Sequence, residues 1–586
     1  VLPINEWVVI SGKIGFFGNK YQITNPDYIT KIDNLDYVNK IIPKYTLTEG
    51  LTEKTYRKII ESVIKNLPEL NEWHDQDLLK KMKFPSWKNS IINLHDPNNS
   101  RNLNSVYYKR LAYDEIFANL LFLSKNRYKI KKIKKNQKKF TKLYSSKLTR
   151  QLPFRLTKNQ LTVCEEIDSD LKSSKRMYRI LQGDVGSGKT IVALLACLNV
   201  IESNFQTALM APTEILAQQH FDLFSKLLKK ANIKINITFL SGKTEQKKRK
   251  QIIQDLKNNK IDFLIGTHAL FQKSIIFKNL GLIIIDEQHK FGVRQRINLA
   301  KKGNEDCDVL LMSATPIPRT MIMSIYGDMD TSKLIEKPSI RQKILTLSKP
   351  ENKINEIWPF IEKKMKEGEQ IFWVCPLIED SKKLDYSSTV KKFNLINKKF
   401  PKKVGVIHGS LNDDEKEKIL KKFLNKEIHI LISTTVIEVG IDFPNATVIV
   451  IENSNKFGLA QLHQLRGRVG RNDIQSYCIL LHKDNIGEIS KQRIDIMKQT
   501  NDGFKIAEED LKIRGPGEIL GKKQSGSPSF YVADLSFDYD LLEDAKIMVE
   551  DILSKNPKLE NIEGENLRNL LYLQERDAAI LTLTAG

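Results

Sequence analysis

The sequence lacks the cysteine pattern of a metal or disulfide site, and it lacks any long apolar run. Its five cysteines are far apart and form no CxxC pair. This spacing argues against a zinc site and a disulfide framework, and it is typical of a reducing cytoplasm. No apolar run approaches the roughly 20 residues of a membrane span, and no signal-peptide pattern opens the chain. We therefore expect a cytoplasmic protein with no membrane partner.

The chain is also poor in acidic residues relative to basic ones. Lys and Arg number 94 against 70 for Asp and Glu, a net charge of +24 over 586 residues. Such a field attracts polyanions, of which nucleic acid is the commonest. A generally lysine-rich composition would give the same balance, so the charge supports nucleic-acid binding without establishing it. A chain of this length is too long to fold around a single hydrophobic core, so we expect several domains.

Hydrophobic patterning divides the chain into segments of different type. Residues 1–50 carry short alternating strands, as in WVVISGKI, and predict part of a small β-barrel. Because the first residue is Val1 and this segment is already strand-like, we expect a preceding N-terminal segment. Residues 51–150 are helical in pattern, and their basic run 129–142 is either a solvated face or a DNA or linker contact.

Two α/β lobes are predicted next, over 151–340 and 341–488. The strings ALMAPT, FLIGTHAL, LIIIDEQH and VLLMSAT are predicted strands that alternate with helices in the first lobe. The predicted strands of the second lobe are IFWVCPLI, VGVIHGS, IHILISTTV, ATVIVIE and YCILLH. Strands of this kind form parallel sheets with functional loops at their carboxyl ends. Ligands are therefore expected in the cleft between the lobes.

The string GDVGSGKT begins at Gly183 and lies between a predicted strand and a predicted helix. Glycines at Gly183, Gly186 and Gly188 allow the backbone N–H groups to surround a phosphate chain. Lys189 would reach the β- and γ-phosphates, and Thr190 would place its hydroxyl on Mg²⁺. The string therefore predicts an ATP site.

Two carboxylates end the apolar strand LIIIDEQH. Asp286 would hold Mg²⁺, and Glu287 would orient and deprotonate the attacking water. Acidic residues at a strand end can instead cap a helix, but the P-loop favours the catalytic interpretation. His289 has no partner at metal-ligand spacing and is expected to link the ATP site to its neighbours.

Groups from two other segments could complete this site. Phe154 and Gln160 could stack on adenine and hydrogen-bond it, although ordinary packing explains them equally well. In QLHQLRGRVGR, Arg468 and Arg471 are three apart, a spacing that places them on one face of a helix. These arginines could reach the γ-phosphate across the cleft, and Gln464 of the same string is a further nucleotide contact.

The ordered strings GDVGSGKT, APTEILAQQH, GTHALFQ, DEQHKFGVRQR, SATPIPRT, IHGSLNDDEK, STTVIEVGIDFPNA and QLRGRVGR resemble those of superfamily-two helicases. The later string DGFKIAEEDLKIRGPGEILGKKQSG resembles the translocation motif of the RecG family, which the transcription-repair coupling translocase shares. The resemblance implies a partial oligonucleotide-binding (OB-fold) wedge, a helical linker, two RecA-like lobes, a translocation hairpin and loop over 489–535, and C-terminal helices over 536–586.

The resemblance also implies roles for residues matched by position. Residues expected to couple the ATP site to DNA movement are His289, Ser313, Thr315, Arg514 and Gln524. Residues expected near DNA are Thr213, Thr267 and Thr435 at its backbone, with Phe17 and Tyr21 as stacking partners for bases at a branch point. Core packing is the alternative for either ring. Lys522 and Lys523 stand where the family has a Thr-Arg pair, a departure that keeps the charge at the second position but puts a bidentate phosphate contact in doubt.

These implications together predict an ATP- and Mg²⁺-dependent DNA helicase. It would unwind and branch-migrate replication forks and Holliday junctions in fork regression, recombination and repair. Branched DNA is the expected partner, with single-stranded-DNA-binding protein as a second, and the expected state is a monomer. The alternatives are the coupling translocase, which pushes RNA polymerase, and a non-catalytic DNA-binding protein with a degenerate ATPase.

Overall fold

The structure is a computed structural model of the chain. It describes residues 6–575 except 25, 27, 40, 48–49, 100–103, 133–134, 273, 288–306, 315–328, 337–341, 377–381, 410, 435–442, 444, 471–473, 515–529 and 535–537. Among these described residues, no helix is both long enough and apolar enough to cross a membrane.

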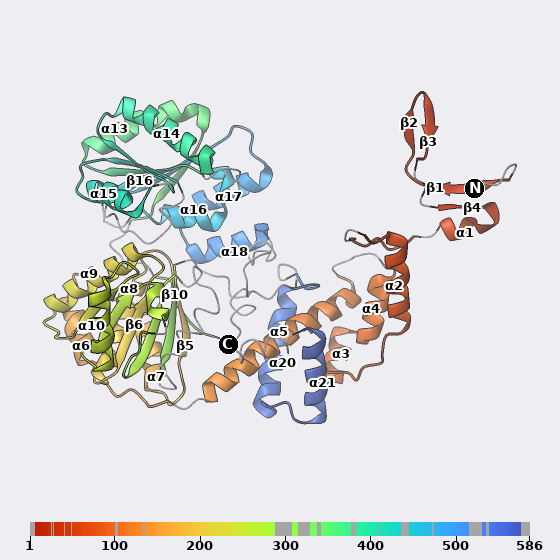
Figure 1. Cartoon of the computed structure of the whole chain (residues 1–586), viewed down its shortest axis with the longest axis horizontal. Coiled ribbons are helices and arrows are strands. Elements are labelled where there is room, and N and C mark those ends of the chain that lie inside the picture. Colours follow the sequence, from red (N-terminus) through yellow and green to blue (C-terminus); the bar gives the residue numbers. More distant parts are fainter. Residues whose placement is uncertain are drawn as a thin grey trace.

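The N-terminal region consists of short antiparallel pairs. Strand β1 (Val8–Ser11) pairs with β4 (Tyr28–Lys31), and β2 (Gly15–Phe17) forms a hairpin with β3 (Lys20–Gln22). The hairpin turn places Gly18 and Asn19 at φ 58° and 62°. Two consecutive left-handed residues are typical of the tight turn that matches strand twist. Figure 1 shows these strands apart from the two lobes, with the short helix α1 (Leu35–Val38) beside β1 and β4.

A helical bundle combines segments from the two ends of the chain. Its members are α2 (Glu53–Lys65), α3 (Gln76–Met82), α4 (Trp87–His95), the long α5 (Val106–Lys132), α20 (Tyr539–Lys555) and α21 (Ile562–Leu573). Apolar side chains of α3, α5, α20 and α21 form one core, and Figure 1 shows α20 and α21 beside α5. The linker and C-terminal segments therefore fold together.

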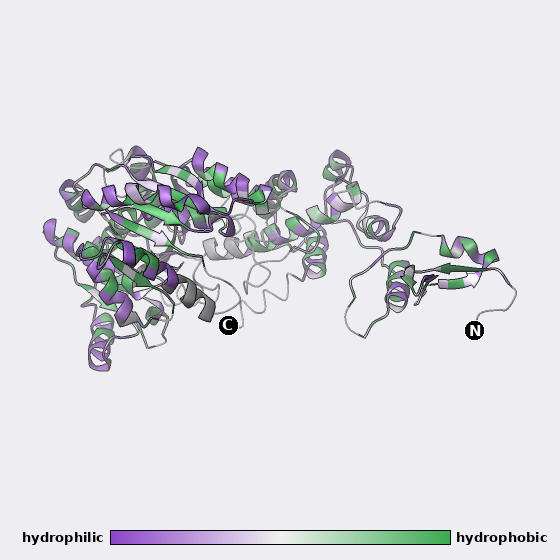
Figure 2. Cartoon of the chain, turned by 90° about the horizontal axis from the view of Figure 1, so that it is seen from above, coloured by the Kyte–Doolittle hydropathy of each residue, from purple (hydrophilic) through white to green (hydrophobic). Residues whose placement is uncertain are grey.

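The first lobe has a seven-stranded parallel sheet in the order β11-β5-β10-β9-β6-β8-β7. The strands are β5 (Tyr178–Gly183), β6 (Gln206–Met210), β7 (Ile237–Leu240), β8 (Phe263–Gly266), β9 (Leu280–Ile285), β10 (Asp308–Ser313) and β11 (Asp330–Leu334). Its helices include α6 (Leu143–Gln151), α7 (Lys158–Lys172), α8 (Lys189–Glu202), α9 (Glu214–Lys230) and α10 (Gln246–Lys257). Figure 2 shows that the strands are mostly hydrophobic and the surrounding helices of mixed polarity, as a sheet buried on both faces requires.

The second lobe has a six-stranded parallel sheet in the order β12-β17-β16-β13-β15-β14. The strands are β12 (Leu345–Pro350), β13 (Gln370–Val374), β14 (Val404–Ile407), β15 (Ile430–Ser433), β16 (Ala446–Ile451) and β17 (Tyr477–His482). Its helices include α13 (Trp358–Lys366), α14 (Lys382–Lys399), α15 (Asp413–Leu424), α16 (Leu459–Arg466), α17 (Glu488–Gln499) and α18 (Gly503–Arg514). Ile494 and Ile506 place α17 and α18 in the core of this lobe. The predicted α/β class with two parallel-sheet lobes is confirmed.

The end of the basic run 129–142 has a structural use. Lys135 and Lys138 each lie 2.7 Å from a carboxylate oxygen of Asp308 at the start of β10, and the three side chains are fully buried. Burial lowers the pKa of Lys135. These two lysines bind the end of the linker to the first lobe, so neither contacts DNA. Phe140 and Leu148, from the segment predicted as linker, likewise pack in the core of the first lobe.

Candidate active site

The P-loop has the geometry that its glycines predicted. It joins β5 to α8, and Gly186 and Gly188 adopt φ 79° and 91°. At Gly183 a Cβ atom would lie 2.4 Å from Ser187 Oγ and 2.9 Å from Leu334 Cβ. The Ser187 hydroxyl oxygen is buried without a hydrogen-bond partner in the described structure. A tightly turned loop with an unused polar atom suits an anionic ligand at the start of a helix.

Lys189 and Thr190 begin α8 at the carboxyl edge of the sheet. Lys189 is buried, and its Nζ donates to the carbonyl oxygens of Gly183 at 2.6 Å and Asp184 at 2.9 Å. The ammonium group therefore lies inside the loop, where a β- or γ-phosphate could replace these carbonyls. Thr190 is half-buried on the first turn.

The carboxylate pair follows β9. Asp286 is 7% exposed, and the Glu287 backbone adopts a left-handed φ of 48°. The Ala314 amide donates to Glu287 Oε2 at 3.3 Å, which links the ends of β9 and β10. Burial raises the pKa of Glu287, as does the Asp286 charge, while Lys189 and Arg468 lower it. A carboxylate with a raised pKa is suited to accept a proton from water.

The structure adds a residue that the sequence reasoning missed. His220 Nε2 lies 2.9 Å from Asp286 Oδ2, and both side chains are nearly buried. His220 comes from α9, whose N-cap Thr213 accepts a hydrogen bond from the Leu216 amide. Thr213 and His220 are two helical turns apart and so share a face. That spacing was the available signal, because it directs both residues of APTEILAQQH toward the same edge of the sheet.

The second lobe touches the P-loop directly. His463 Nε2 of α16 lies 2.8 Å from Asp184 Oδ1. A Cβ atom at Gly467 would lie 3.0 Å from Val185 Cβ, so only a glycine allows this approach without a shift. Ile215 of the first lobe also packs against the second lobe's core. Figure 1 shows α16 on the side of the second lobe that faces the first.

The predicted placement of Arg468 on a helix is wrong. Helix α16 ends at Arg466, and Gly467 is its C-cap, so Arg468 lies beyond the helix. Past the C-cap, the chain turns at Gly470, which adopts a left-handed φ of 75°. Arg468 is nonetheless buried, and its charge reaches Glu287 of the other lobe. Gln464 is half-buried on α16, and Arg471 lies outside the described residues.

Gln160 supports the P-loop. Its Nε2 donates to the Ser187 carbonyl at 2.8 Å, and its Oε1 accepts from the Thr157 amide. Phe154 packs partly against the core of the first lobe. Contact of either residue with adenine stays a prediction.

The structure describes the side chains of only some of the remaining predicted residues of the two lobes and the hairpin. Ser313 and Thr267 are buried at the carboxyl ends of β10 and β8. Four predicted residues lie outside the described residues: His289, Thr315, Thr435 and Gln524. Arg514 ends α18, and its side chain is not described.

The two predicted stacking rings are on the β2–β3 hairpin. Phe17 is 76% exposed and Tyr21 is 80% exposed. Phe16 contacts Tyr21 edge to face, with ring centroids 5.1 Å apart. Neither Phe17 nor Tyr21 is packed in a core formed by the described residues.

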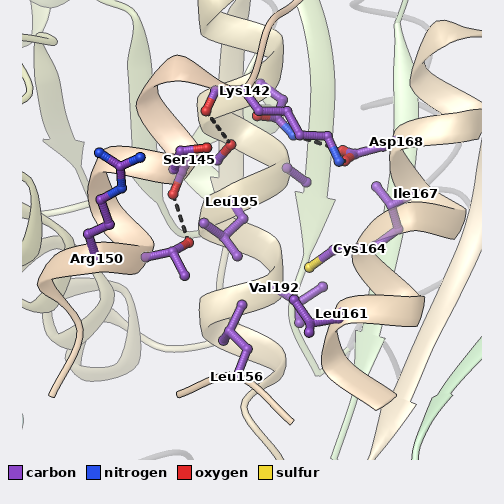
Figure 3. A pocket seen from close by; sticks show the side chains of 14 residues that line it. Lys142, Ser145, Arg150, Leu156, Leu161, Cys164, Ile167, Asp168, Val192 and Leu195 are labelled. Atoms are coloured by element: carbon purple, nitrogen blue, oxygen red, sulfur yellow. Dashed lines mark hydrogen bonds and ion pairs between the residues drawn. The ribbon is translucent and has the colours of Figure 1, made fainter. Parts of the chain in front are cut away.

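A separate cavity of about 350 Å³ lies along α8 in the first lobe, between α6 and α7 (Figure 3). Its wall includes Leu195, Cys164 and the Lys142–Asp168 ion pair, whose N–O distance is 2.6 Å. Burial raises the pKa of the Cys164 thiol to about 12, so this thiol stays protonated. None of the predicted site residues lines the cavity.

A phosphate loop and carboxylate pair on one parallel sheet, covered by an arginine from a second, define a two-lobed RecA-like nucleotide-driven motor. Four family models match the chain: the RecG wedge domain over 1–67, the DEAD/DEAH box helicase over 157–323, the helicase conserved C-terminal domain over 352–473, and the C-terminal part of domain 3 of ATP-dependent DNA helicase RecG over 500–578.

Comparison with individual proteins gives the same family as the family models. The chain is 44% identical to ATP-dependent DNA helicase RecG of Thermotoga maritima over 92% of its own length and 69% of the relative. It is 41% identical to that of Bacillus subtilis, over 90% and 78%. A solved structure of RecG bound to a three-way DNA junction matches with 41% identity and a TM-score of 0.67, over 92% of this chain and 70% of that one. The chain belongs to the RecG family of ATP-dependent DNA helicases, which excludes the coupling translocase and the non-catalytic alternative.

Proposed function

We propose that this chain uses ATP and Mg²⁺ to move along duplex DNA and to unwind and branch-migrate forks and Holliday junctions. The pathways would be fork regression, recombination and repair. The observation that carries the motor part is the contact of α16 with the P-loop, through His463 and Asp184 at 2.8 Å. Opening or closing the lobes must change this contact, so occupancy of the P-loop can be linked to lobe movement.

The residues at the P-loop fit a nucleotide with its metal. Amide groups of the P-loop and Lys189 would hold the phosphates, while Thr190 and Asp286 would hold Mg²⁺. A bound Mg²⁺ supplies neutralisation of phosphate charge. Glu287 would take the proton of the attacking water, and Arg468 would stabilise charge on the γ-phosphoryl group.

Branch recognition would use the β2–β3 hairpin. Its exposed rings can stack on unpaired bases, and such stacking is tolerant of sequence because every base has a flat face. The relative solved on a three-way junction supports this choice of DNA. Phosphate contacts would supply most of the affinity, and they would make it fall with rising salt.

Replacing Phe17 tests the branch assignment. Phe17→Ala should weaken binding to a model fork about tenfold, because loss of a stacked base costs roughly 1–3 kcal/mol. Binding to plain duplex should change less than about twofold, because phosphate contacts dominate there. Fluorescence anisotropy with both DNAs at one salt concentration measures the two affinities.

Tyr572→Ala is the matched control, because Tyr572 is 75% exposed on α21, away from the hairpin. Equal loss of fork and duplex binding in Phe17→Ala would remove the hairpin from branch recognition. Absence of fork-stimulated ATP hydrolysis in the unmodified chain would instead contradict the proposed function itself.

Three finer properties stay predictions. A monomeric state and contact with single-stranded-DNA-binding protein follow only from the family resemblance. A cytoplasmic location agrees with five cysteines that are all free.

A further inference from the structure

A buried carboxylate on the linker helix holds the chain just after residues 515–529. Glu115, in the middle of α5, is 1% exposed. Its Oε1 accepts from the Tyr531 amide at 2.5 Å, and its Oε2 accepts from the amides of Val532 and Ala533 at 2.9 Å each. Three consecutive N–H groups on one carboxylate form a charge-assisted anchor of a kind that neutral side chains do not reproduce.

Neighbouring groups restrain the same stretch. The Tyr108 hydroxyl, two helical turns before Glu115, lies 3.0 Å from both the Val532 carbonyl oxygen and Asp538 Oδ2. Asp538 Oδ2 also accepts from the Asp534 amide at 2.8 Å. The side chains of Val532 and Ala533 pack against the bundle core. Residues 531–533 are therefore fixed to α5 by their backbone amides, and the side chains of Val532 and Ala533 hold the same stretch against the bundle.

The chain on the other side of residues 515–529 belongs to a different body. Helix α18 ends at Arg514 and packs in the core of the second lobe through Ile506. Helix α5, in contrast, leads into Lys135 and Lys138, whose buried ion pairs with Asp308 bind it to the first lobe. Movement of the second lobe relative to the first must therefore move Arg514 relative to Glu115.

We propose that Glu115 is a positioning residue for coupling ATP hydrolysis to DNA movement, an inference that rests on the proposed function. Its carboxylate keeps residues 531–533, near the end of the predicted translocation hairpin and loop (489–535), stationary on α5. Displacement of α18 is then transmitted to DNA. If the 531–533 stretch were free to follow α18, the same lobe movement would be absorbed without work on the duplex.

Glu115→Gln removes the charge and replaces one acceptor oxygen by an NH₂ group, which cannot accept from an amide. At least one of the three hydrogen bonds is then lost. We expect the number of base pairs unwound per ATP hydrolysed to fall about tenfold, because the anchored position of 531–533 loses the stabilisation of a hydrogen bond to a charged group. ATP hydrolysis stimulated by a model fork should stay within about twofold, because Glu115 does not touch the nucleotide site. Amide hydrogen exchange at Val532 and Ala533 should become faster.

Glu69→Gln is the matched control, since Glu69 forms an exposed ion pair with Lys88 and has no contact with 530–534. Tyr108→Phe is a second variant that loosens the same stretch through the Val532 carbonyl without changing charge, and it should lower the ratio less than Glu115→Gln does. This variant decides the question if Glu115→Gln fails to fold. Thermal melting of each full chain reports folding.

An unchanged unwinding-to-hydrolysis ratio, with faster exchange at Val532 and Ala533, would overturn the inference and leave the anchor purely structural. Parallel loss of hydrolysis and unwinding would overturn it as well, because it would place Glu115 in the motor itself. If the unmodified chain hydrolyses ATP but unwinds no fork, the proposed function fails instead, independently of either variant.

Discussion

The two lobes share an architecture and differ in chemistry. Both have a buried parallel sheet covered by helices. In the first lobe β5 ends in a glycine loop and β9 in two carboxylates. In the second lobe β13 is followed by Cys375, whose Sγ lies 3.7 Å from Glu452 Oε2, and Lys392 pairs with that glutamate at 2.5 Å. The fold therefore provides the edge of a sheet, and the residues placed there decide its use.

This division makes each lobe incomplete for hydrolysis. In the proposed mechanism, the first lobe would supply the groups that bind phosphate and metal, and its Glu287 would be the base. The second supplies Arg468, together with His463 against the P-loop. A catalytic centre assembled from two bodies is complete only when they approach each other, which is how hydrolysis can be tied to movement. The variants below test whether the lobes contribute as unequally as this comparison predicts.

The largest loss is expected from the first lobe. Lys189→Ala should abolish DNA-stimulated ATP hydrolysis, with a loss beyond about 10³-fold, because a preorganised charge at the β/γ-phosphates disappears. Steady-state hydrolysis with saturating fork DNA measures it. The exposed Lys229→Ala of α9 serves as control. Near-normal turnover in Lys189→Ala would refute the site.

The second lobe should affect the rate more than binding. Arg468→Ala should lower kcat by about 10³-fold, the low end for an arginine that stabilises phosphoryl-transfer charge. The Kd for ATP should change little, because ground-state phosphate binding is assigned to the first lobe. Arg150→Ala, at an exposed arginine on α6, is the control. A loss confined to ATP affinity would assign Arg468 to binding.

The direct contact between the lobes should matter less. His463→Ala removes the partner of Asp184 and should raise KM for ATP about tenfold, as expected for one buried hydrogen bond to a charged group. His482, half-buried at the end of β17, gives the comparison variant, His482→Ala. If KM stays constant in His463→Ala, the contact does not contribute to nucleotide binding.

The smallest effect concerns pH. Glu287 must be ionised to act as a base, and burial raises its pKa above the ordinary value of 4.5. Activity should therefore be lost on acidification at a higher pH than for an ordinary glutamate. The pH profile of kcat measures this limb, and circular dichroism over the same range reports folding. A limb at the pH of an unperturbed carboxyl group would remove Glu287 as the base.

Sequence patterning predicted every central strand of the two sheets and one of their four edge strands, β14. The predicted strands became β5, β6, β8, β9, β10 and β13–β17, because continuous apolar runs flanked by turns favour buried parallel strands. Strands β7, β11 and β12 were not predicted. All three are edge strands and are only partly buried. Their sequences, such as DTSKL in β11, therefore carry a weak apolar signal.

Site prediction divided along a similar boundary. Gly186, Lys189, Asp286 and Glu287 are adjacent to their strands, so local sequence placed them at the sheet edge. His220 and Asp184 were missed, because their partners are distant in sequence and only packing brings them together. Arg468 was assigned to a helix that in fact ends before it, because a spacing of three residues carries no information about where a helix stops.

The order of its motifs determined by itself that this chain has a phosphate loop, a carboxylate pair and two parallel lobes. These features depend on residues that are close together in sequence, and the local sequence determines their conformational preferences. Tertiary structure alone decided that Lys135 and Lys138 form ion pairs with Asp308 instead of contacting DNA. It also decided that Glu115 binds the backbone of 531–533, near the other end of the chain. The sequence around a charged side chain does not specify its partner, because the partner of a buried charge is often a residue distant in sequence.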